Sequence, residues 1–380
     1  MDGASLRSVK LFESLYKSYS IDVITYKKNQ NFNYIKKCFP KTKFYFFSKI
    51  IKQNKKSSYF GRLFSKKLPG FLSHDPELIA KDIDRIILKN KTYTILYYAT
   101  QLMGQARLYS KDQTHSIIDL YEVYSVYSKS KVSNLSFYQP YFWIFLIEAF
   151  RIKVFEEKII EKFQTIFVTC DENYDSVQKF SSSCEIIQIP NGTLIPDHIN
   201  ISKGKNILMV ANFEYSGNFI GIEWFFNNVW SDLKLRMDVD LVLVGRSSKR
   251  LKKLLENDPS VKIKGQVENL QPFYEDAFCA IIPLFNDGGT KTKLIEALAY
   301  GVPVVSTPIG AKGFEHMSTI KISEDQIDFA NHIEYYFANK YPYKDLKKNH
   351  LMIKNNFTWK KIGEDLKLYM NEIISRLKSN

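Results

Sequence analysis

Three charged residues follow a glycine-containing loop in the segment from residue 283 to residue 313. The loop runs from Asn286 to Thr290, and the charged residues are Lys291, Lys293 and Glu296. A glycine pair before a helix lets backbone approach a ligand closely, and the free amides of a first helical turn attract anions. The pattern predicts a site for a phosphate-bearing ligand, with Glu296 placed to reach a neighbouring sugar hydroxyl. An ordinary strand–helix unit with a glycine turn is the alternative interpretation.

The elements around this loop have clear boundaries. Residues 280 to 283 predict a strand that leads into the loop, and residues 291 to 300 predict a helix. Gly301 ends that helix, as a glycine just past the last turn does. Residues 302 to 307 predict a buried strand, which Pro308 and Gly310 end. Further back, residues 270 to 277 predict a helix.

The ten residues that start at Glu296, Glu-Ala-Leu-Ala-Tyr-Gly-Val-Pro-Val-Val, resemble a known donor-site signature. It is that of retaining, two-domain glycosyltransferases of family 4 (glycosyl transferases group 1), in the branch with a Gly-Gly-Thr-Lys-x-Lys loop. The resemblance implies that Glu296 contacts the donor ribose and that Lys293 also acts in catalysis. The family usually carries a second glutamate eight positions earlier, where this chain has Gly288. The donor-binding residues implied by this segment are Gly288, Gly289, Thr290, Lys291, Lys293 and Glu296.

Three other turns supply further candidates for donor binding. Asn212 begins a turn that resembles the branch's Gly-x-x-x-x-x-Pro-Asn turn, with Gly217 in the proline position. Many relatives carry an Arg/Lys pair near this turn, and this loop has neither. Arg246, which follows the predicted strand 241–244, is suited to bidentate phosphate contact, with simple solvent exposure as the alternative. Gly3 lies in a sequence similar to the Gly-Gly-Ala-Ser-like loop after the family's first strand.

Two acidic residues in the first half are candidates for a catalytic role. Asp119 lies near the end of the predicted strand 116–120, and Glu122 follows that strand. Open α/β sheets bind ligands at the carboxyl ends of their strands, and the resemblance implies a histidine or acidic residue here, near the transferred sugar. A helix cap or a solvated turn is the alternative. His115 is interpreted as a surface residue before the strand, and Glu156 as part of a solvated face of the predicted helix 138–163.

The chain is expected to have an α/β fold with two domains, because 380 residues exceed one comfortable domain. The resemblance implies the GT-B fold, in which two facing Rossmann-like domains flank a central cleft. The expected parts are an acceptor-binding domain (residues 1–195), a nucleotide-sugar-binding domain (206–355) and a C-terminal helix that crosses back (356–380). The first strand of the N-terminal domain is expected to be missing, because the chain begins directly with a helix pattern.

Composition narrows the classes of partner. The formal charge of +14 suggests anionic partners, although a genome bias toward lysine would raise it as well. The four cysteines form no Cys-x-x-Cys pair, which argues against a disulfide framework or a zinc site. The sequence shows no signal segment and no run of ~20 apolar residues. A basic, aromatic-rich segment from about residue 49 to 68 predicts binding to an anionic membrane surface, with a solvated face as the alternative.

These patterns predict a glycosyltransferase that moves a sugar, with retention, from a nucleotide diphosphate sugar to a saccharide or lipid-linked acceptor. Its role would be in cell-surface polysaccharide or glycoconjugate synthesis. We expect no cofactor and no metal, because Asp287 is the only hard ligand in the donor loop. We expect no nucleic acid partner, and a cytoplasmic location that extends to the inner face of the membrane. The oligomeric state is not indicated. A catalytically inactive glycosyltransferase-like subunit is the alternative, and a dehydrogenase is disfavoured because no Gly-x-Gly-x-x-Gly pattern follows a first strand.

Overall fold

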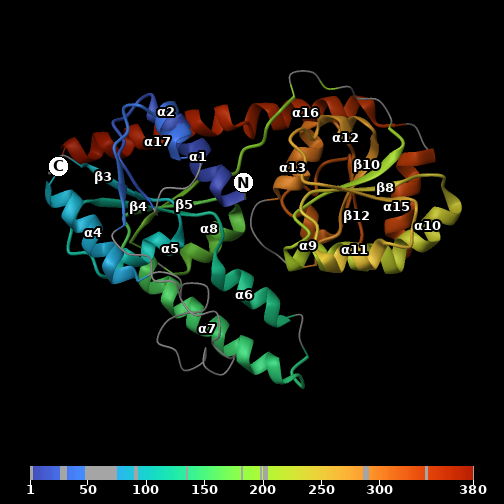
Figure 1. Ribbon diagram of the computed structural model, residues 1–380, viewed down its shortest axis with the longest axis horizontal. Coiled ribbons are helices and arrows are strands. Elements are labelled where there is room, and N and C mark those ends of the chain that lie inside the picture. The colour runs from blue at the N-terminus through green and yellow to red at the C-terminus, as the bar shows by residue number, and fades with distance from the viewer. Residues whose placement is uncertain are drawn as a thin grey trace. The chain divides into compact units, whose positions relative to one another are not determined.

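The computed structural model describes residues 3–25, 32–47, 75–89, 93–133, 136–180, 183–196, 199, 204–285, 291–338 and 341–379 (Figure 1). The chain forms two compact units, one of residues 1–190 and 362–380 and the other of residues 191–287 and 291–361. The basic segment 49–68 and the loop residues Gly288, Gly289 and Thr290 lie outside the described residues. In the described part, no helix is both long enough and apolar enough to span a membrane.

The second unit is built on a six-stranded parallel sheet with the strand order β12-β11-β10-β7-β8-β9. This arrangement confirms the predicted α/β class for this unit. Its strands are β7 (Asn206–Val210), β8 (Leu241–Val244), β9 (Val261–Gly265), β10 (Ala277–Ile282), β11 (Val304–Ser306) and β12 (Ile320–Ile322). Its helices are α9 (Ser216–Phe225), the π-helical turn η2 (Phe226–Trp230), α10 (Ser231–Arg236), α11 (Lys249–Leu255), α12 (Gln271–Glu275), α13 (Thr292–Ala299), α14 (Pro308–Ala311), α15 (Gln326–Ala338) and α16 (Tyr343–Asn356).

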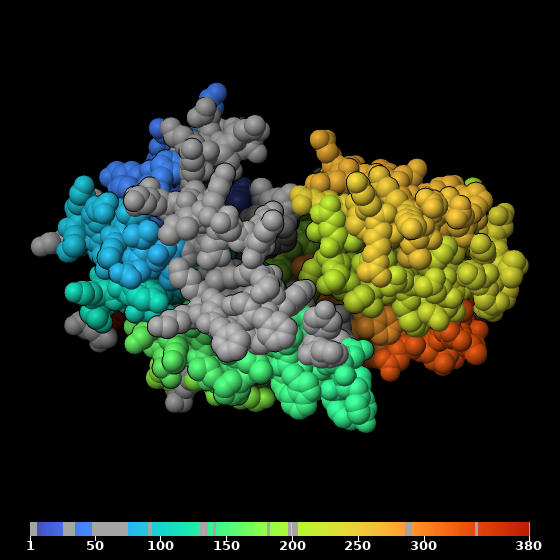
Figure 2. All heavy atoms as spheres, turned by 60° about the horizontal axis from the view of Figure 1, so that its bottom comes forward, coloured from blue at the N-terminus to red at the C-terminus, as the bar shows by residue number. Residues whose placement is uncertain are grey.

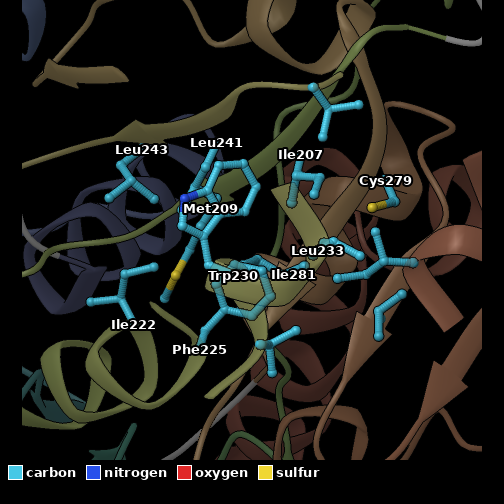
Figure 3. Close-up of a cluster of buried hydrophobic side chains, with 14 of the residues drawn as sticks. Ile207, Met209, Ile222, Phe225, Trp230, Leu233, Leu241, Leu243, Cys279 and Ile281 are labelled. Atoms are coloured by element: carbon cyan, nitrogen blue, oxygen red, sulfur yellow. The ribbon is translucent and has the colours of Figure 1, made fainter. Parts of the chain in front are cut away.

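Alternate residues of the strands supply two separate cores. Ile207 and Met209 of β7 pack with Phe225 and Trp230 on one face of the sheet, against α9 to α11 and α15 (Figure 3). Leu208 of the same strand packs on the other face, with α12, α13 and α16. Side chains on a strand alternate between the two faces, so a strand covered on both sides must be apolar throughout. This is why β8 and β10 are continuous apolar runs, whereas the edge strands β9 and β12 alternate apolar residues with lysine.

Strand β10 begins earlier than the sequence indicates. Residues 270–277 predict a helix, but α12 ends at Glu275 and Ala277 already belongs to the strand. All six residues of β10 are buried, and β10 pairs with β7 in parallel. A short apolar run fits a buried helix or a buried strand equally well by pattern, and here the pairing with the central strand decides the outcome.

The first unit contains two parallel sheets, a pair β1-β2 and a four-stranded sheet β3-β4-β5-β6. The first described element is a helix, α1. The strands are β1 (Val23–Thr25), β2 (Phe44–Phe46), β3 (Ile95–Tyr98), β4 (His115–Leu120), β5 (Thr165–Val168) and β6 (Glu185–Gln188). The helices are α1 (Gly3–Tyr16), α2 (Phe32–Cys38), α4 (Pro76–Lys89), α5 (Gln101–Gly104), the 3-10 turn η1 (Gln105–Leu108), α6 (Tyr124–Ser133), α7 (Pro140–Ile160), α8 (Asp171–Gln178) and, from residue 362, α17 (Trp359–Ser379).

Helix α17 joins the two units through one continuous element, because its first residues belong to the second unit and the rest to the first. Ile362, Leu366 and Ile373 of this helix are buried. A Cβ on Gly363 would lie 2.2 Å from the hydroxyl of Ser14, so α17 and α1 approach closely. The last residues of the chain are therefore part of the structure of the first unit.

Glu156 is buried, which corrects its interpretation as part of a solvated face. It is 1% exposed, and its carboxylate accepts hydrogen bonds from the backbone amides of Tyr124 (2.6 Å) and Ser125 (2.9 Å) at the start of α6. The side chain of Gln101 donates a third bond at 2.8 Å. Burial raises the pKa of Glu156, and these hydrogen bonds oppose the shift. The carboxylate thus caps the free amides of α6 and ties that helix to α7.

Candidate functional site

The six-stranded sheet has one point where its chain connections diverge. From β7 the chain moves outward to β8 and β9, whereas from β10 it moves outward in the other direction to β11 and β12. Open α/β sheets bind ligands outside the carboxyl ends of the strands at such a switch point. The loops that leave β7 and β10 here lead to α9 and α13. These two helix starts are therefore the part of the sheet where a ligand is expected.

Lys293 and Asn218 connect these two helix starts. The ammonium group of Lys293 on α13 donates a 2.6 Å hydrogen bond to Oδ1 of Asn218 on α9. The side-chain amide of Asn218 donates in turn to the backbone carbonyl of Asn212 at 2.7 Å. Asn218 is 4% exposed, so its orientation is fixed by these partners. The contacts join the predicted residues Lys293 and Asn212 across the switch point.

Gly221 makes this approach of the two helices sterically feasible. A Cβ added at Gly221 would lie 1.9 Å from the carbonyl oxygen of Pro283, just past β10. No side chain fits at that distance, so α9 can lie over the end of β10 only with glycine at this position. The close approach places Asn218, one helical turn earlier, beside Lys293.

Glu296 has a different partner on the neighbouring helix α12. The hydroxyl of Tyr274 donates to Oε2 of Glu296 at 3.1 Å. The rings of Tyr274 and Tyr300 are stacked, with centroids 4.5 Å apart and an angle of 8° between their planes. Burial, followed by the charge of Glu296, raises the pKa of Tyr274 well above its usual value. The tyrosine therefore remains a hydrogen-bond donor and holds the carboxylate at the surface of α13.

The two charged groups of α13 perturb each other. Burial, followed by repulsion from Lys291, lowers the pKa of Lys293 to about 8, while attraction to Glu296 opposes the shift. Burial raises the pKa of Glu296 to about 7, while the Tyr274 hydrogen bond and Lys293 oppose that shift. Both groups thus change charge near neutral pH. Titratable groups shifted in this way are typical of functional sites, because a bound ligand can supply the missing counter-charge.

Arg246 lies in the adjacent loop after β8. The backbone amide of Phe213 donates to the carbonyl of Arg246 at 2.8 Å, which ties this loop to the loop after β7. The Arg246 side chain is exposed and donates to Oε1 of Gln266 at 3.2 Å. Lys291 immediately precedes α13, at its N-cap position. The described donor-site residues predicted in this unit, Asn212, Arg246, Lys291, Lys293 and Glu296, therefore all follow carboxyl ends of neighbouring strands.

The predicted residues of the first unit form a separate group. Asp119 is 0% exposed, and Arg7 of α1 donates to both of its carboxylate oxygens, at 2.8 to 3.1 Å. The hydroxyl of Tyr97 donates to Asp119 at 2.9 Å, and Arg7 also bonds the carbonyl of Pro190 at 3.1 Å. This network attaches α1 to the sheet, so the structure gives Asp119 a structural role. Any catalytic role would require Asp119 to leave Arg7.

The remaining residues of this unit that the sequence analysis singled out are Glu122, Gly3 and His115. Glu122 is half-buried in the short turn between β4 and α6, and Gly3 is the first residue of α1. Their catalytic and donor-binding roles stay predictions. His115 lies within β4 rather than before it, and its ring is 3.1 Å from the hydroxyl of Thr165. Burial lowers the pKa of His115. The expectation that His115 precedes the strand is therefore wrong, and the residue is half-buried rather than simply exposed.

A surface hollow of about 570 Å³ lies at the opposite end of the six-stranded sheet. It is lined by residues at the amino ends of the strands, among them Asn206, Asp240 and Lys262. None of the predicted donor-site residues contributes to it. Volume alone does not identify the site here, because parallel sheets bind ligands at the carboxyl ends of their strands.

Asn218, Tyr274 and Tyr300 were not among the residues predicted from the sequence. Asn218 occupies the asparagine position of the turn in which Gly217 replaces proline, so that turn carried a usable signal. The pairing of Tyr274 with Glu296 joins residues 22 positions apart on different helices, and no local pattern indicates it.

The class of fold is that of the GT-B glycosyltransferases. Sucrose-phosphate synthase from Thermosynechococcus elongatus matches with a TM-score of 0.70 at 16% identity, over 99% of this chain and 94% of that one. Anabaena HepE, solved in complex with UDP, matches with a TM-score of 0.68 at 12% identity, over 98% and 96% of the two chains. At these identities the likeness concerns the fold.

Sequence comparison places the clearest relationship in the second unit. Residues 204–339 match the family model described as glycosyl transferases group 1. A Klebsiella pneumoniae protein, described as an uncharacterized 44.6 kDa protein in the cps region, is 28% identical over 205 residues. That match covers 48% of this chain and 53% of the relative, so it spans about half the length of the relative. The matched family segment contains the whole of the Lys293–Asn218 and Glu296–Tyr274 arrangement.

Proposed function

We propose that this protein transfers a glycosyl group from a nucleotide diphosphate sugar to a saccharide or lipid-linked acceptor, with retention of anomeric configuration. The observation that carries the proposal is the contact between Lys293 and Asn218 at the switch point, with Glu296 on the same helix as Lys293. An ammonium group near a helix start suits a diphosphate, and a carboxylate further along suits a ribose hydroxyl. The match of residues 204–339 to glycosyl transferases group 1 supports this assignment.

In this reaction the second unit must stabilise the leaving diphosphate. When the bond between the anomeric carbon and the diphosphate oxygen breaks, its electrons and a negative charge remain on that oxygen. The ammonium of Lys293 and the free amides at the start of α13 stabilise this charge in fixed positions. The acceptor oxygen forms the new bond on the face that the diphosphate left, and its proton passes to the departing diphosphate oxygen. Glu122 remains the candidate in the first unit for a group near the transferred sugar, because Asp119, the other predicted residue, is buried and held by Arg7.

A uridine diphosphate sugar is the first donor to test. HepE has been solved with UDP-glucose, and it shares the GT-B fold. The Klebsiella relative is described as belonging to a cps region, which supports a role in cell-surface polysaccharide synthesis. With a lipid-linked acceptor, the protein would work in the cytoplasm at the inner face of the membrane. The chain's basic segment 49–68 would favour that location by attraction to anionic lipid.

The experiment is to incubate the full chain with a panel of uridine, guanosine, thymidine and adenosine diphosphate sugars and short saccharide acceptors. Release of the nucleoside diphosphate measures turnover, and NMR of the product identifies its anomeric configuration. Turnover that depends on acceptor and gives the donor's own configuration is expected. Nucleotide binding without turnover on any acceptor would support the alternative of an inactive subunit, which the intact contacts of Lys293 and Glu296 do not favour.

Metal independence is part of this proposal and is tested in the same assay. Because charge on the leaving diphosphate is offset by Lys293 and helix amides, activity should persist after treatment with EDTA. Glycosyl transfer that EDTA abolishes and added magnesium or manganese restores would show that a divalent ion supplies this charge instead.

A further inference from the structure

The first half of α7 is apolar on all sides, yet it is not buried. Of residues 141 to 150, nine are apolar or aromatic, and Glu148 carries the only charge. No residue from 142 to 150 is buried. Trp143, Leu146, Ile147 and Phe150 are 57%, 41%, 47% and 67% exposed. Their spacing of three and four residues places them on one face of the helix, so they form a continuous apolar strip.

This strip belongs to a helical hairpin whose base is anchored to the sheet of its unit. Helices α6 and α7 lie side by side, and Figure 1 shows the connected ends of the two helices away from the sheet of the N-terminal unit. Glu156 and the buried Ile152 hold the second half of α7 at the base. Near the connecting loop, Phe137 and Tyr138 are 55% and 81% exposed, with ring centroids 3.7 Å apart. Green atoms of this region are visible at the surface along the lower edge of the space-filling view (Figure 2).

We propose that the α6–α7 hairpin docks on an anionic lipid bilayer, with the face formed by Trp143, Leu146, Ile147 and Phe150 inserted at headgroup level. A contiguous strip of large exposed apolar side chains marks an interaction surface. Tryptophan, tyrosine and phenylalanine beside aliphatic residues are typical of side chains at the membrane–water boundary. The apolar stretch of about ten residues is roughly 15 Å long as a helix, half the thickness of a bilayer core, so it lies in one leaflet.

The charge of the hairpin favours an anionic lipid surface, rather than a second copy of this chain, as the partner that covers the apolar strip. The hairpin, residues 124 to 160, contains five basic and three acidic residues, of which Glu156 is buried. Lys129 on α6 and Lys153 on α7 are exposed, and Lys153 lies one helical turn beyond Phe150, 3.7 Å from the carboxylate of Glu157. Basic residues near an anionic surface add attraction that salt screens. Two copies joined through this strip would bring like charges together, which opposes self-association.

The test uses the full chain and vesicles of phosphatidylcholine, with and without phosphatidylglycerol. Sedimentation measures the bound fraction. The variant W143Q/L146Q/F150Q should reduce partition into the anionic vesicles roughly tenfold or more, because it removes most of the inserted apolar area. The matched control is L235Q/L351Q/L368Q, which replaces three exposed leucines (82%, 55% and 61% exposed) on other helices. This control should bind as wild type does, and circular dichroism checks that both variants are folded.

Tryptophan fluorescence reports on the surroundings of Trp143 in the hairpin. Trp143 is more exposed than Trp230, which is buried, so vesicles should shift the emission of wild type to the blue. W143F should bind vesicles but lose this shift. The proposal is overturned if wild type ignores anionic vesicles, if W143Q/L146Q/F150Q binds them as well as wild type, or if W143F keeps the shift. A dimer in vesicle-free solution that the triple variant dissolves, without vesicle binding by wild type, would show that a second copy covers this strip.

Discussion

Glu296 has both a raised pKa and a fixed orientation. Burial raises its pKa to about 7, yet the hydroxyl of Tyr274 keeps one oxygen oriented. A carboxylate held in this way loses little conformational freedom when it binds a hydroxyl. Its contribution to binding should therefore be large compared with its contribution to folding.

Replacing Glu296 with alanine should weaken UDP binding by roughly tenfold or more, since a hydrogen bond to a charged group contributes about 1.5–3 kcal/mol. Isothermal titration calorimetry measures the affinity. Thermal unfolding without nucleotide should change little, because Tyr274 retains its stacking partner Tyr300. Glu268→Ala, at an exposed glutamate after β9, is the matched control. Equal UDP affinity for Glu296→Ala and wild type would contradict the donor-site assignment.

The affinity for UDP should pass through a maximum between about pH 7 and pH 8. Glu296, with its pKa raised to about 7, must ionise to accept a ribose hydroxyl, so affinity rises as pH increases through that value. Lys293, with its pKa lowered to about 8, loses its charge above that value, so affinity then falls. Titrations from pH 6 to pH 9 measure the profile. Glu296→Gln should remove the rise and Lys293→Met the fall, and a flat wild-type profile would rule out both roles.

The stability of the ligand-free protein should depend on pH in the opposite way to UDP affinity. It should be lowest between about pH 7 and pH 8, where the affinity is highest. Because the folded-state pKa of Glu296 is raised, its contribution to stability is greatest at low pH and is lost as pH rises toward about 7. Because the folded-state pKa of Lys293 is lowered, the folded protein binds fewer protons than the unfolded chain above about pH 8, and stability recovers there. The charges that bind the donor therefore disfavour the empty fold in the same pH range.

At the scale of elements, the sequence predicted strands and helix ends correctly where the signal lay within a few neighbouring residues. The buried strands β4 and β8 were visible as apolar runs, and the end of α13 was visible as Gly301, which has φ +71°. Partners distant in sequence were not visible. Asp119 pairs with Arg7, 112 residues away, and Glu156 caps α6 from 31 residues downstream. Asp119 was predicted as a catalytic candidate and Glu156 as part of a solvated face, because a sequence pattern does not show what covers a side chain.

The close approach of α9 to β10 gives a prediction at this scale. Gly221→Ala should destabilise the fold by roughly 1–3 kcal/mol and weaken UDP binding, because the new Cβ would collide with the carbonyl oxygen of Pro283 and shift Asn218. Gly217→Ala in the same helix is the control. Its Cβ would meet only the exposed ring of Tyr215, at 3.0 Å, so the variant should be neutral or slightly stabilised by helix propensity. Chemical denaturation and calorimetry separate the two, and equal behaviour would contradict the packing argument.

At the scale of the whole molecule, the sequence predicted two α/β parts and a last helix that crosses back to the first part. The domain that matches glycosyl transferases group 1 carried the more specific motifs, so its site was predicted residue by residue. The first unit was predicted only loosely. Its sheets contain strands of three to six residues, whose apolar character is common to many folds. The apolar half of α7 was predicted as helix, but its exposure depends on how the hairpin leaves the core.

The course of α17 has a consequence for how the protein is made. Residues 1–190 emerge from the ribosome first, yet their unit is complete only when residues 362–380 arrive. At about 5–20 residues per second, the intervening segment takes roughly 10 to 30 s to synthesise. During that interval the surface that later covers Ile362, Leu366 and Ile373 is open to the cell. The second unit, which is continuous in sequence, has no such delay. The nascent first unit is therefore the part of the chain that we expect to need protection from aggregation during synthesis, because α17 is made only after the whole of the second unit.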